Sequence, residues 1–180
     1  MAATAKQSAV VTLPTDTQIL IRREFDAPRH LVYQAWTTPE FIKRWWSACR
    51  GEVTVAEIDL RVGGRWRYAM IAHGDFEVAF HGEFREVVKN ERIVRTEIYE
   101  AFPEAGALST ETFTESDGRT TLTLLVDHER QEHRDAHVQS GMEDGLQDAL
   151  DLPAASATAR GATARGATAR GATADVTAAT

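Results

Sequence analysis

Two histidines near the carboxyl end of the chain have the spacing of a metal site. His133 and His137 are four residues apart on a predicted helix, so one helical face would carry both, as it carries two zinc ligands. No third ligand stands at a recognisable spacing, and the chain has one cysteine. A polar first turn on a solvated helix is the simpler interpretation. We therefore predict no metal site and no cofactor.

Two other residues have the chemistry of a nucleophile. Arg50 would lower the pKa of the neighbouring Cys49 thiol, but no histidine that could act as its base is identifiable nearby. Ser140 lacks the Gly-x-Ser-x-Gly context of a nucleophile turn. The pair Gly63-Gly64 joins two predicted strands instead of leading into a helix, so it indicates a turn and not a phosphate loop. We assign no catalytic residue.

Charged residues near the predicted interior offer a third kind of chemistry. Asp59 and Arg61 are two residues apart at a strand end, so they point to the same side and could polarise a ligand. An ion pair that holds the turn is the simpler interpretation. Glu57, Glu97 and His128 are the other titratable candidates. A titratable side chain inside an apolar cavity would favour an enzyme over a binding module.

A set of aromatic residues is the most informative feature. They come from a predicted helix and two predicted strands that should border one interior. A filled core would use them well, but a curved sheet around one helix also encloses a volume that few side chains can fill. Gly141 and Gly145 leave part of one helical face without side chains. We predict a ligand cavity lined by Trp46, Trp66, Tyr68, Met70, Phe80, Phe84, Gly141, Met142 and Gly145.

The elements that must position these residues follow from the periodicity of the sequence. Residues 17–25 alternate as a strand, and two short helices begin near Asp26-Ala27-Pro28 and Thr38-Pro39-Glu40. Residues 129–152 have a helical period that Pro153 ends. An antiparallel sheet with its helices on one face is an α+β fold. Between the helices, alternation predicts strands at 52–60, 65–72, 76–85, 92–99, 109–115 and 119–128.

Composition divides the chain into three parts. We expect a flexible amino-terminal segment at residues 1–16, one domain at residues 17–152, and a tail at residues 153–180. The tail repeats Gly, Ala, Thr and Arg with a period of five and has no large apolar side chain before Val176. Such a segment cannot bury enough apolar surface to offset the entropy of ordering, so we expect it to be disordered.

Charge and hydropathy exclude some classes of partner. The net charge of -7 disfavours nucleic acid, because phosphate binding requires a basic face. No apolar run approaches the roughly 20 residues of a membrane span, and residues 1–18 lack the pattern of a secretion signal. A single cysteine allows no internal disulfide. We expect a cytoplasmic protein that is a monomer or a homodimer.

Four segments of the chain, in order, resemble one family. They are REFDAPRHLVYQAWTTPEFIKRWW, DLRVGGRWRYAM, HGEFREVVKNERIV and SGMEDGLQDALD. Together they are similar to the branch of the START-like (SRPBCC) superfamily named for activators of the heat-shock protein 90 ATPase, carboxyl-terminal-domain type. The resemblance covers about residues 18–152. It implies a helix-grip fold, in which a curved antiparallel sheet of about six or seven strands wraps around the long last helix and a cavity lies between them.

Three functions are compatible with this resemblance. We favour a binder of a small hydrophobic or amphipathic molecule over an enzyme. One alternative is an enzyme of the cyclase or lyase kind, in which the cavity orients a substrate and a polar group moves a proton. The other is a co-chaperone with a chaperone ATPase as its partner, although the eukaryotic co-chaperones of the family carry an additional amino-terminal domain. An apolar patch outside the cavity would favour this last function.

Overall fold

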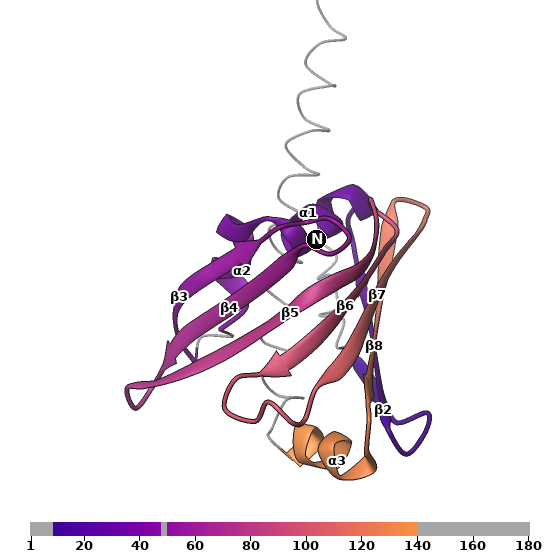
Figure 1. Ribbon diagram of the computed structural model, residues 1–180. Coiled ribbons are helices and arrows are strands. Elements are labelled where there is room, and N and C mark those ends of the chain that lie inside the picture. Colours follow the sequence, from indigo (N-terminus) through magenta and orange to yellow (C-terminus); the bar gives the residue numbers. More distant parts are fainter. Residues whose placement is uncertain (1–8, 48–49, 140–180) are drawn as a thin grey trace, which may run out of the picture.

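A curved sheet of eight antiparallel strands forms most of the protein (Figure 1). The computed structural model describes residues 9–47 and 50–139. The order of the strands across the sheet is β1-β2-β8-β7-β6-β5-β4-β3. The strands are β1 (Val10–Thr12), β2 (Gln18–Phe25), β3 (Gly51–Ile58), β4 (Arg65–Ala72), β5 (Phe76–Val88), β6 (Arg92–Tyr99), β7 (Ala107–Ser116) and β8 (Arg119–His128).

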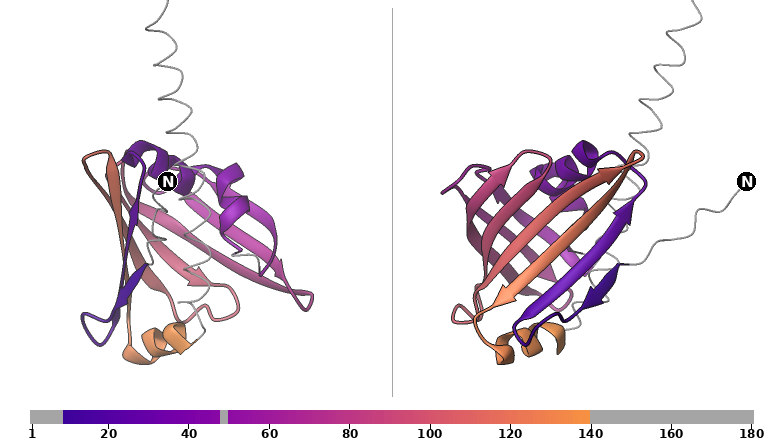
Figure 2. Two further views of the ribbon diagram at one scale, coloured as in Figure 1. Left: turned by 180° about the vertical axis from the view of Figure 1, so that it is seen from behind. Right: turned by 90° about the vertical axis from the view of Figure 1, so that its right-hand side faces the viewer.

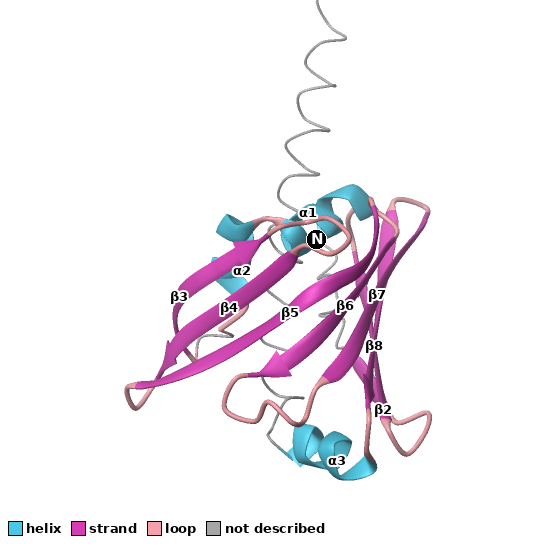
Figure 3. Cartoon of the chain, viewed as in Figure 1, coloured by secondary structure: helices cyan, strands magenta, loops and turns pink. Residues whose placement is uncertain are grey.

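The helices lie at the two ends of this sheet (Figures 2 and 3). The first two, α1 (Arg29–Thr37) and α2 (Pro39–Trp45), follow β2 at one end. The third, α3 (Gln131–Gln139), follows β8 at the opposite end. Among the helices in the described ranges, none is both long and apolar enough to cross a membrane.

The predicted α+β class and order of elements are confirmed, and β4, β6 and β8 have the predicted bounds. The sequence does not predict β1, because Val-Val-Thr is too short to show alternation; it adds an edge strand to the six or seven expected. The helix α1 begins at Arg29 with Pro28 at its N-cap, not with the expected Asp26 or Ala27 there. The predicted helix 129–152 is described only as far as Gln139.

The hairpin between β7 and β8 shows how local sequence fixes the register of the sheet. Asp117 and Gly118 have φ angles of 53° and 74°. Positive φ at both central residues is the type I′ turn, whose twist matches that of paired strands. The pairing then runs without a shift from Ser116 and Arg119 to Ala107 and His128. This pairing fixes which side chains of the two strands face inward.

The concave face of the sheet is the inner face of the protein. Helix α1 packs there, and the Tyr33 ring meets the Phe113 ring edge to face with centroids 5.4 Å apart. Each such apolar side chain contributes about 1.5–3 kcal/mol when fully buried. One half of the inner face is thus a packed core. Six of its inward apolar side chains on β2, β7 and β8 are at most 2 % exposed: Ile19, Ile21, Phe25, Phe113, Leu122 and Val126.

Candidate ligand site on the inner face of the sheet

Strands β4 and β5 carry an aromatic wall on the inner face. Trp66 and Tyr68 are 3 % and 2 % exposed, and their ring centroids lie 4.7 Å apart. Trp46, which follows α2, meets Tyr68 edge to face at 5.6 Å and Phe80 at 5.9 Å. The predicted inward direction of Trp66 and Tyr68 is confirmed. We refer to Trp46, Trp66, Tyr68 and Phe80 as the aromatic wall.

A glycine on the neighbouring strand allows Trp66 to lie against the sheet. Gly82 of β5 is paired with Trp66, and a Cβ atom on Gly82 would be 1.8 Å from the Thr96 carbonyl oxygen and 2.7 Å from Trp66 Nε1. In the space that this glycine leaves, Trp66 Nε1 donates a hydrogen bond to the Thr96 oxygen at 3.1 Å. The indole N–H is therefore satisfied, and the ring is held in one orientation.

Beside the aromatic wall lies a buried ion pair that the sequence did not lead us to expect. The Arg95 guanidinium of β6 is centred 4.3 Å from the Trp66 ring, which is cation–π distance. Its Nε and Nη2 atoms each lie 2.9 Å from Glu111 Oε1 of β7, and its Nη1 atom donates to the Tyr68 hydroxyl at 3.3 Å. The Glu111 side chain is fully buried. A charged group thus adjoins the aromatic wall.

Register explains why these polar side chains meet. Arg95 is paired with Ser109, and Glu97 and Glu111 lie two residues further along their own strands, so all four face inward. Glu97 makes no side-chain hydrogen bond with a described residue, and its side chain is only partly buried. We refer to Tyr68, Arg95, Glu97, Ser109 and Glu111 as the inner polar cluster.

Burial shifts the acid–base behaviour of this cluster. It raises the pKa of Glu97 and of Glu111 above the ordinary range, and the nearby Arg95 offsets part of each shift. Glu97 further raises the pKa of Glu111, because the two carboxylates repel each other. Burial alone would lower the pKa of Arg95, but Glu111, Tyr68 and Glu97 together outweigh this effect and raise it. Arg95 stays charged, while the two carboxyls hold a proton more readily than usual.

Several polar atoms around the cluster have no hydrogen-bond partner. They include Ser109 Oγ and Glu111 Oε2, both on side chains of residues with 0 % exposure. The Trp36 indole N–H helps to lower the pKa of Glu111 but makes no hydrogen bond of good geometry with a described residue. An unpaired buried polar atom costs about 1–3 kcal/mol. The described residues around the cluster therefore leave several buried hydrogen-bonding atoms without a partner.

The titratable candidates from the sequence separate into two groups. Glu57 and Asp59 are exposed, and Arg61 forms a two-pronged ion pair with Asp59 at 2.8 and 3.1 Å. This pair holds the turn and belongs to no cavity. Glu97 and His128 face inward instead. The inner face therefore does contain titratable groups.

The predicted histidine pair takes a different arrangement from a metal site. His137 Nδ1 lies 3.1 Å from His128 Nε2, which joins α3 to the end of β8. Within the described ranges, no three metal-ligating side chains are grouped to hold an ion. Burial, followed by His137 and His133, lowers the pKa of His128 to about 4. The contact therefore joins two neutral rings at neutral pH.

The remaining predicted cavity residues divide between the described and the undescribed parts of the chain. Phe84 is 2 % exposed and Met70 is half-buried on the same strand face as Trp66. Gly141, Met142 and Gly145 lie outside the described residues, as do the nucleophile candidates Cys49 and Ser140. The described cavity candidates are therefore those on the sheet and on the segment after α2.

Arg95, Ser109 and Glu111 are the residues that sequence reasoning missed. The signal was present in the alternation, because Arg95 shares a strand face with the apolar Ile93, and Glu111 shares one with Phe113. A charged residue in phase with a buried apolar neighbour can indicate a buried charge.

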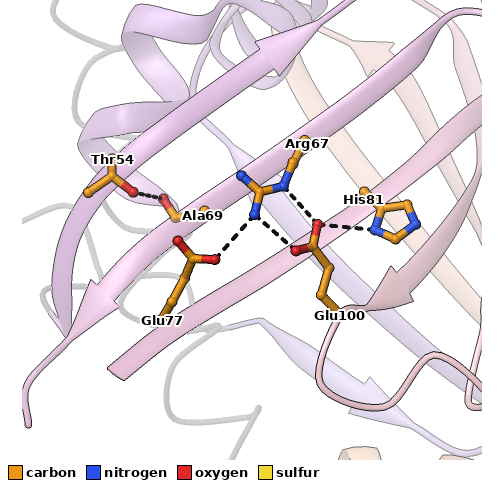
Figure 4. A network of polar contacts seen from close by, with 6 residues as sticks. All are labelled: Thr54, Arg67, Ala69, Glu77, His81 and Glu100. Atoms are coloured by element: carbon orange, nitrogen blue, oxygen red, sulfur yellow. Dashed lines mark hydrogen bonds and ion pairs between the residues drawn. The ribbon is translucent and has the colours of Figure 1, made fainter. Parts of the chain in front are cut away.

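The convex face of the same sheet carries an ordinary surface network (Figure 4). Arg67 of β4 contacts both carboxylate oxygens of Glu100, at 2.7 and 2.9 Å, and one oxygen of Glu77 at 3.2 Å. His81 Nδ1 lies 3.2 Å from a Glu100 oxygen. Arg67 lowers the pKa of Glu100 through this hydrogen bond. The side chains are 30–52 % exposed. Solvent-exposed ion pairs such as these are worth about 0–1 kcal/mol, so they support cross-strand pairing and no chemistry.

A surface recess of about 460 Å³ lies at the loop between β6 and β7, and Thr96, Ala107 and His128 form part of its lining. Its rim includes the exposed residues Pro103, Glu104, Leu108 and Glu129. Such a rim removes little water from a ligand, so we do not place the site there.

Comparison with known proteins agrees with this fold. The chain is similar to a protein of known structure from Rhodobacter sphaeroides (22 % identity, TM-score 0.79, covering 84 % of this chain and 99 % of that one). It is also similar to one from Mycobacterium smegmatis (26 % identity, TM-score 0.73, 82 % and 95 %). An AHSA1-like protein from Aeromonas hydrophila is a further similar structure (25 % identity, TM-score 0.62, 76 % and 93 %). No curated protein matches the chain.

A family model gives the identity of the domain. Residues 26–152 match the model described as "Activator of Hsp90 ATPase homolog 1-like protein". The matched range covers both short helices and every strand from β3 to β8. The chain therefore belongs to the family of activator of Hsp90 ATPase homolog 1-like proteins.

Proposed function

We propose that this protein binds a small hydrophobic or amphipathic molecule against the inner face of its sheet. The observation that supports this most is the juxtaposition of the aromatic wall with the inner polar cluster, where Arg95 touches both. A core that only needed filling would avoid such groups, because a buried charge costs several kcal/mol unless it is fully paired. An apolar wall with a few convergent polar groups is the usual composition of a ligand site.

The opposite wall of the site is assigned to the segment predicted as the last helix. Gly141, Met142 and Gly145 would face the aromatic wall from there. Small side chains at two of these positions leave room between helix and sheet. The ligand would then be enclosed by sheet and helix together, with its apolar body on the aromatic wall and its polar end at the inner polar cluster.

Native mass spectrometry of the protein purified from its own host tests this proposal. We expect a mass above that of the chain, with release of a small molecule on denaturation. A control sample, unfolded and refolded before measurement, should have the mass of the chain alone. Detection of the bare chain in both samples, together with no uptake of an added neutral apolar fluorophore, would contradict the proposal.

A second candidate function, an enzyme of the cyclase or lyase kind, is favoured by one observation. Glu97 and Glu111 are inward-facing carboxyls whose pKa values burial raises, and a carboxyl that holds its proton more readily than usual is suited to proton transfer. The released molecule separates the two functions when it is incubated with fresh protein and with the Glu97→Gln variant. Conversion by the wild type alone would indicate an enzyme, and an unchanged molecule in both reactions would indicate a binder.

A further inference from the structure

The carboxyls of the inner polar cluster have acceptor atoms left without a partner. All three nitrogens of the Arg95 guanidinium are engaged, two with Glu111 Oε1 and one with the Tyr68 hydroxyl, and its face is covered by Trp66. The second Glu111 oxygen has no partner. The Glu97 carboxyl has no side-chain hydrogen bond with a described residue. A carboxylate oxygen accepts hydrogen bonds and cannot donate them when ionised.

The charge of the cluster also favours a ligand that donates a hydrogen bond over one that carries a negative charge. The cluster contains two carboxyls and one guanidinium; burial is the main cause of the raised pKa values of both carboxyls, and repulsion from Glu97 adds to the pKa of Glu111. Arg23, a second cation among the described residues of this face, is on β2 and lies over the Phe25 ring at 5.8 Å. A ligand that brought another negative charge would add to the repulsion, because like charges at short range disfavour ionisation. A ligand that brought a hydrogen-bond donor would satisfy Glu111 Oε2 at once.

We propose that the ligand carries a hydrogen-bond donor, a hydroxyl or an amine, at one end of its apolar body, and that Glu97 and Glu111 receive this donor. The same skeleton ending in a carboxylate or a phosphate is rejected. Ser109 Oγ lies beside the two carboxyls in the register of the sheet and supplies a further acceptor for the same group. This inference rests on the proposed function, since it specifies the ligand of that same site.

Chain-matched probes test the inference on the full-length protein at pH 7.5. A neutral apolar fluorophore, N-phenyl-1-naphthylamine, is bound first and is then displaced by decan-1-ol, decylamine, methyl decanoate or decanoate. We expect the alcohol and the amine to displace the fluorophore at concentrations at least ten-fold lower than the ester and the acid. Equal potency of all four compounds, or a preference for decanoate, would overturn the inference. Either result would leave the proposed function standing.

Two variants locate the effect. Glu97→Gln should weaken displacement by decylamine about ten-fold and improve displacement by decanoate, because one negative charge is removed from the site. Glu83→Gln removes a charge from an exposed ion pair with Arg85 on the opposite face and should change neither. Identical effects of the two variants would overturn the inference. No binding of the fluorophore itself would instead contradict the proposed function.

Discussion

At the scale of single residues, Arg95 connects the core to the candidate site. Its side chain is 11 % exposed, it stacks on Trp66, and it neutralises Glu111. A buried pair of this kind often adds little net stability, but removing one partner leaves an uncompensated charge behind. Arg95 and Glu111 therefore depend on each other, and their coupling can be measured.

A double-mutant cycle tests this dependence. Arg95→Met should lower the free energy of unfolding by about 3–5 kcal/mol at neutral pH, because Glu111 is left charged and buried. The loss should shrink as the pH falls, since the carboxyl can then take up a proton. Adding Glu111→Leu should restore much of the stability. Additive losses in urea denaturation would show that the two side chains do not form a coupled pair.

Gly82 gives a second prediction at this scale. A Cβ atom there would overlap the Thr96 carbonyl and press on the Trp66 indole, so Gly82→Ala should cost about 2–3 kcal/mol and shift the tryptophan fluorescence. Gly106→Ala is the matched control, because its nearest neighbour would be 3.7 Å away, at ordinary contact distance. Similar small effects of both substitutions in thermal and urea unfolding would mean that the sheet easily adjusts around Trp66.

At the scale of elements, α3 is attached to the sheet by polar contacts. His137 meets His128, and the buried Arg134 donates from Nη1 to the Thr15 carbonyl oxygen at 3.2 Å. Few apolar side chains contribute, since Arg134 is the one buried residue of α3. An element held by polar contacts responds to pH more than one held by apolar packing.

Acidification should therefore destabilise the protein through this helix. An unfolded histidine has a pKa of about 6.5, whereas that of His128 is about 4 in the folded protein. The contribution is fully present above pH 6.5 and is lost as the pH falls toward 4, because the unfolded chain then binds a proton that the folded chain does not. The loss should reach about 3 kcal/mol for His128 alone. His137, His133 and Arg134 also lower the pKa of His128, and Asp127 raises it.

Comparison of the wild type with His128→Gln isolates this contribution, measured as the free energy of unfolding between pH 7 and pH 4. Glu97 and Glu111 act oppositely, since their raised pKa values favour protonation of the folded state, but they are common to both proteins. The variant should lose less stability over this range. Parallel curves would show that His128 is as easily protonated in the folded chain as in the unfolded one.

The same scale shows how far the sequence could predict this structure. Alternation and turn residues gave β4, β6 and β8 to the residue, because these strands are long and bounded by turns such as Asp117-Gly118. The inner polar cluster could not be assembled in this way. Its members come from β4, β6 and β7, and the pairing of Arg95 with Ser109 places the guanidinium diagonally across from Glu111, which is paired with Ile93. Such a register is a property of the folded sheet.

At the scale of the whole molecule, the family fold separates two faces of different composition. The convex face carries exposed ion pairs such as Arg67 with Glu100, while the concave face carries the aromatic wall and the inner polar cluster. Exposed large apolar residues of the described part come from separate segments, among them Val62, Phe76 and Phe102. The concave face is thus where the described residues concentrate the chemistry needed to recognise a ligand.

Titration of the full chain with N-phenyl-1-naphthylamine, combined with urea unfolding, tests the central claim most directly. The wild type should bind the fluorophore saturably, and Trp66→Ala should change its affinity while costing less than the about 3–5 kcal/mol typical of a large aromatic removed from a filled core. Phe102→Ala, a 64 % exposed aromatic in the loop after β6, should change neither quantity. If the wild type does not bind the fluorophore and Trp66→Ala costs the full amount, then Trp66 is part of a filled core and the inner face holds no ligand.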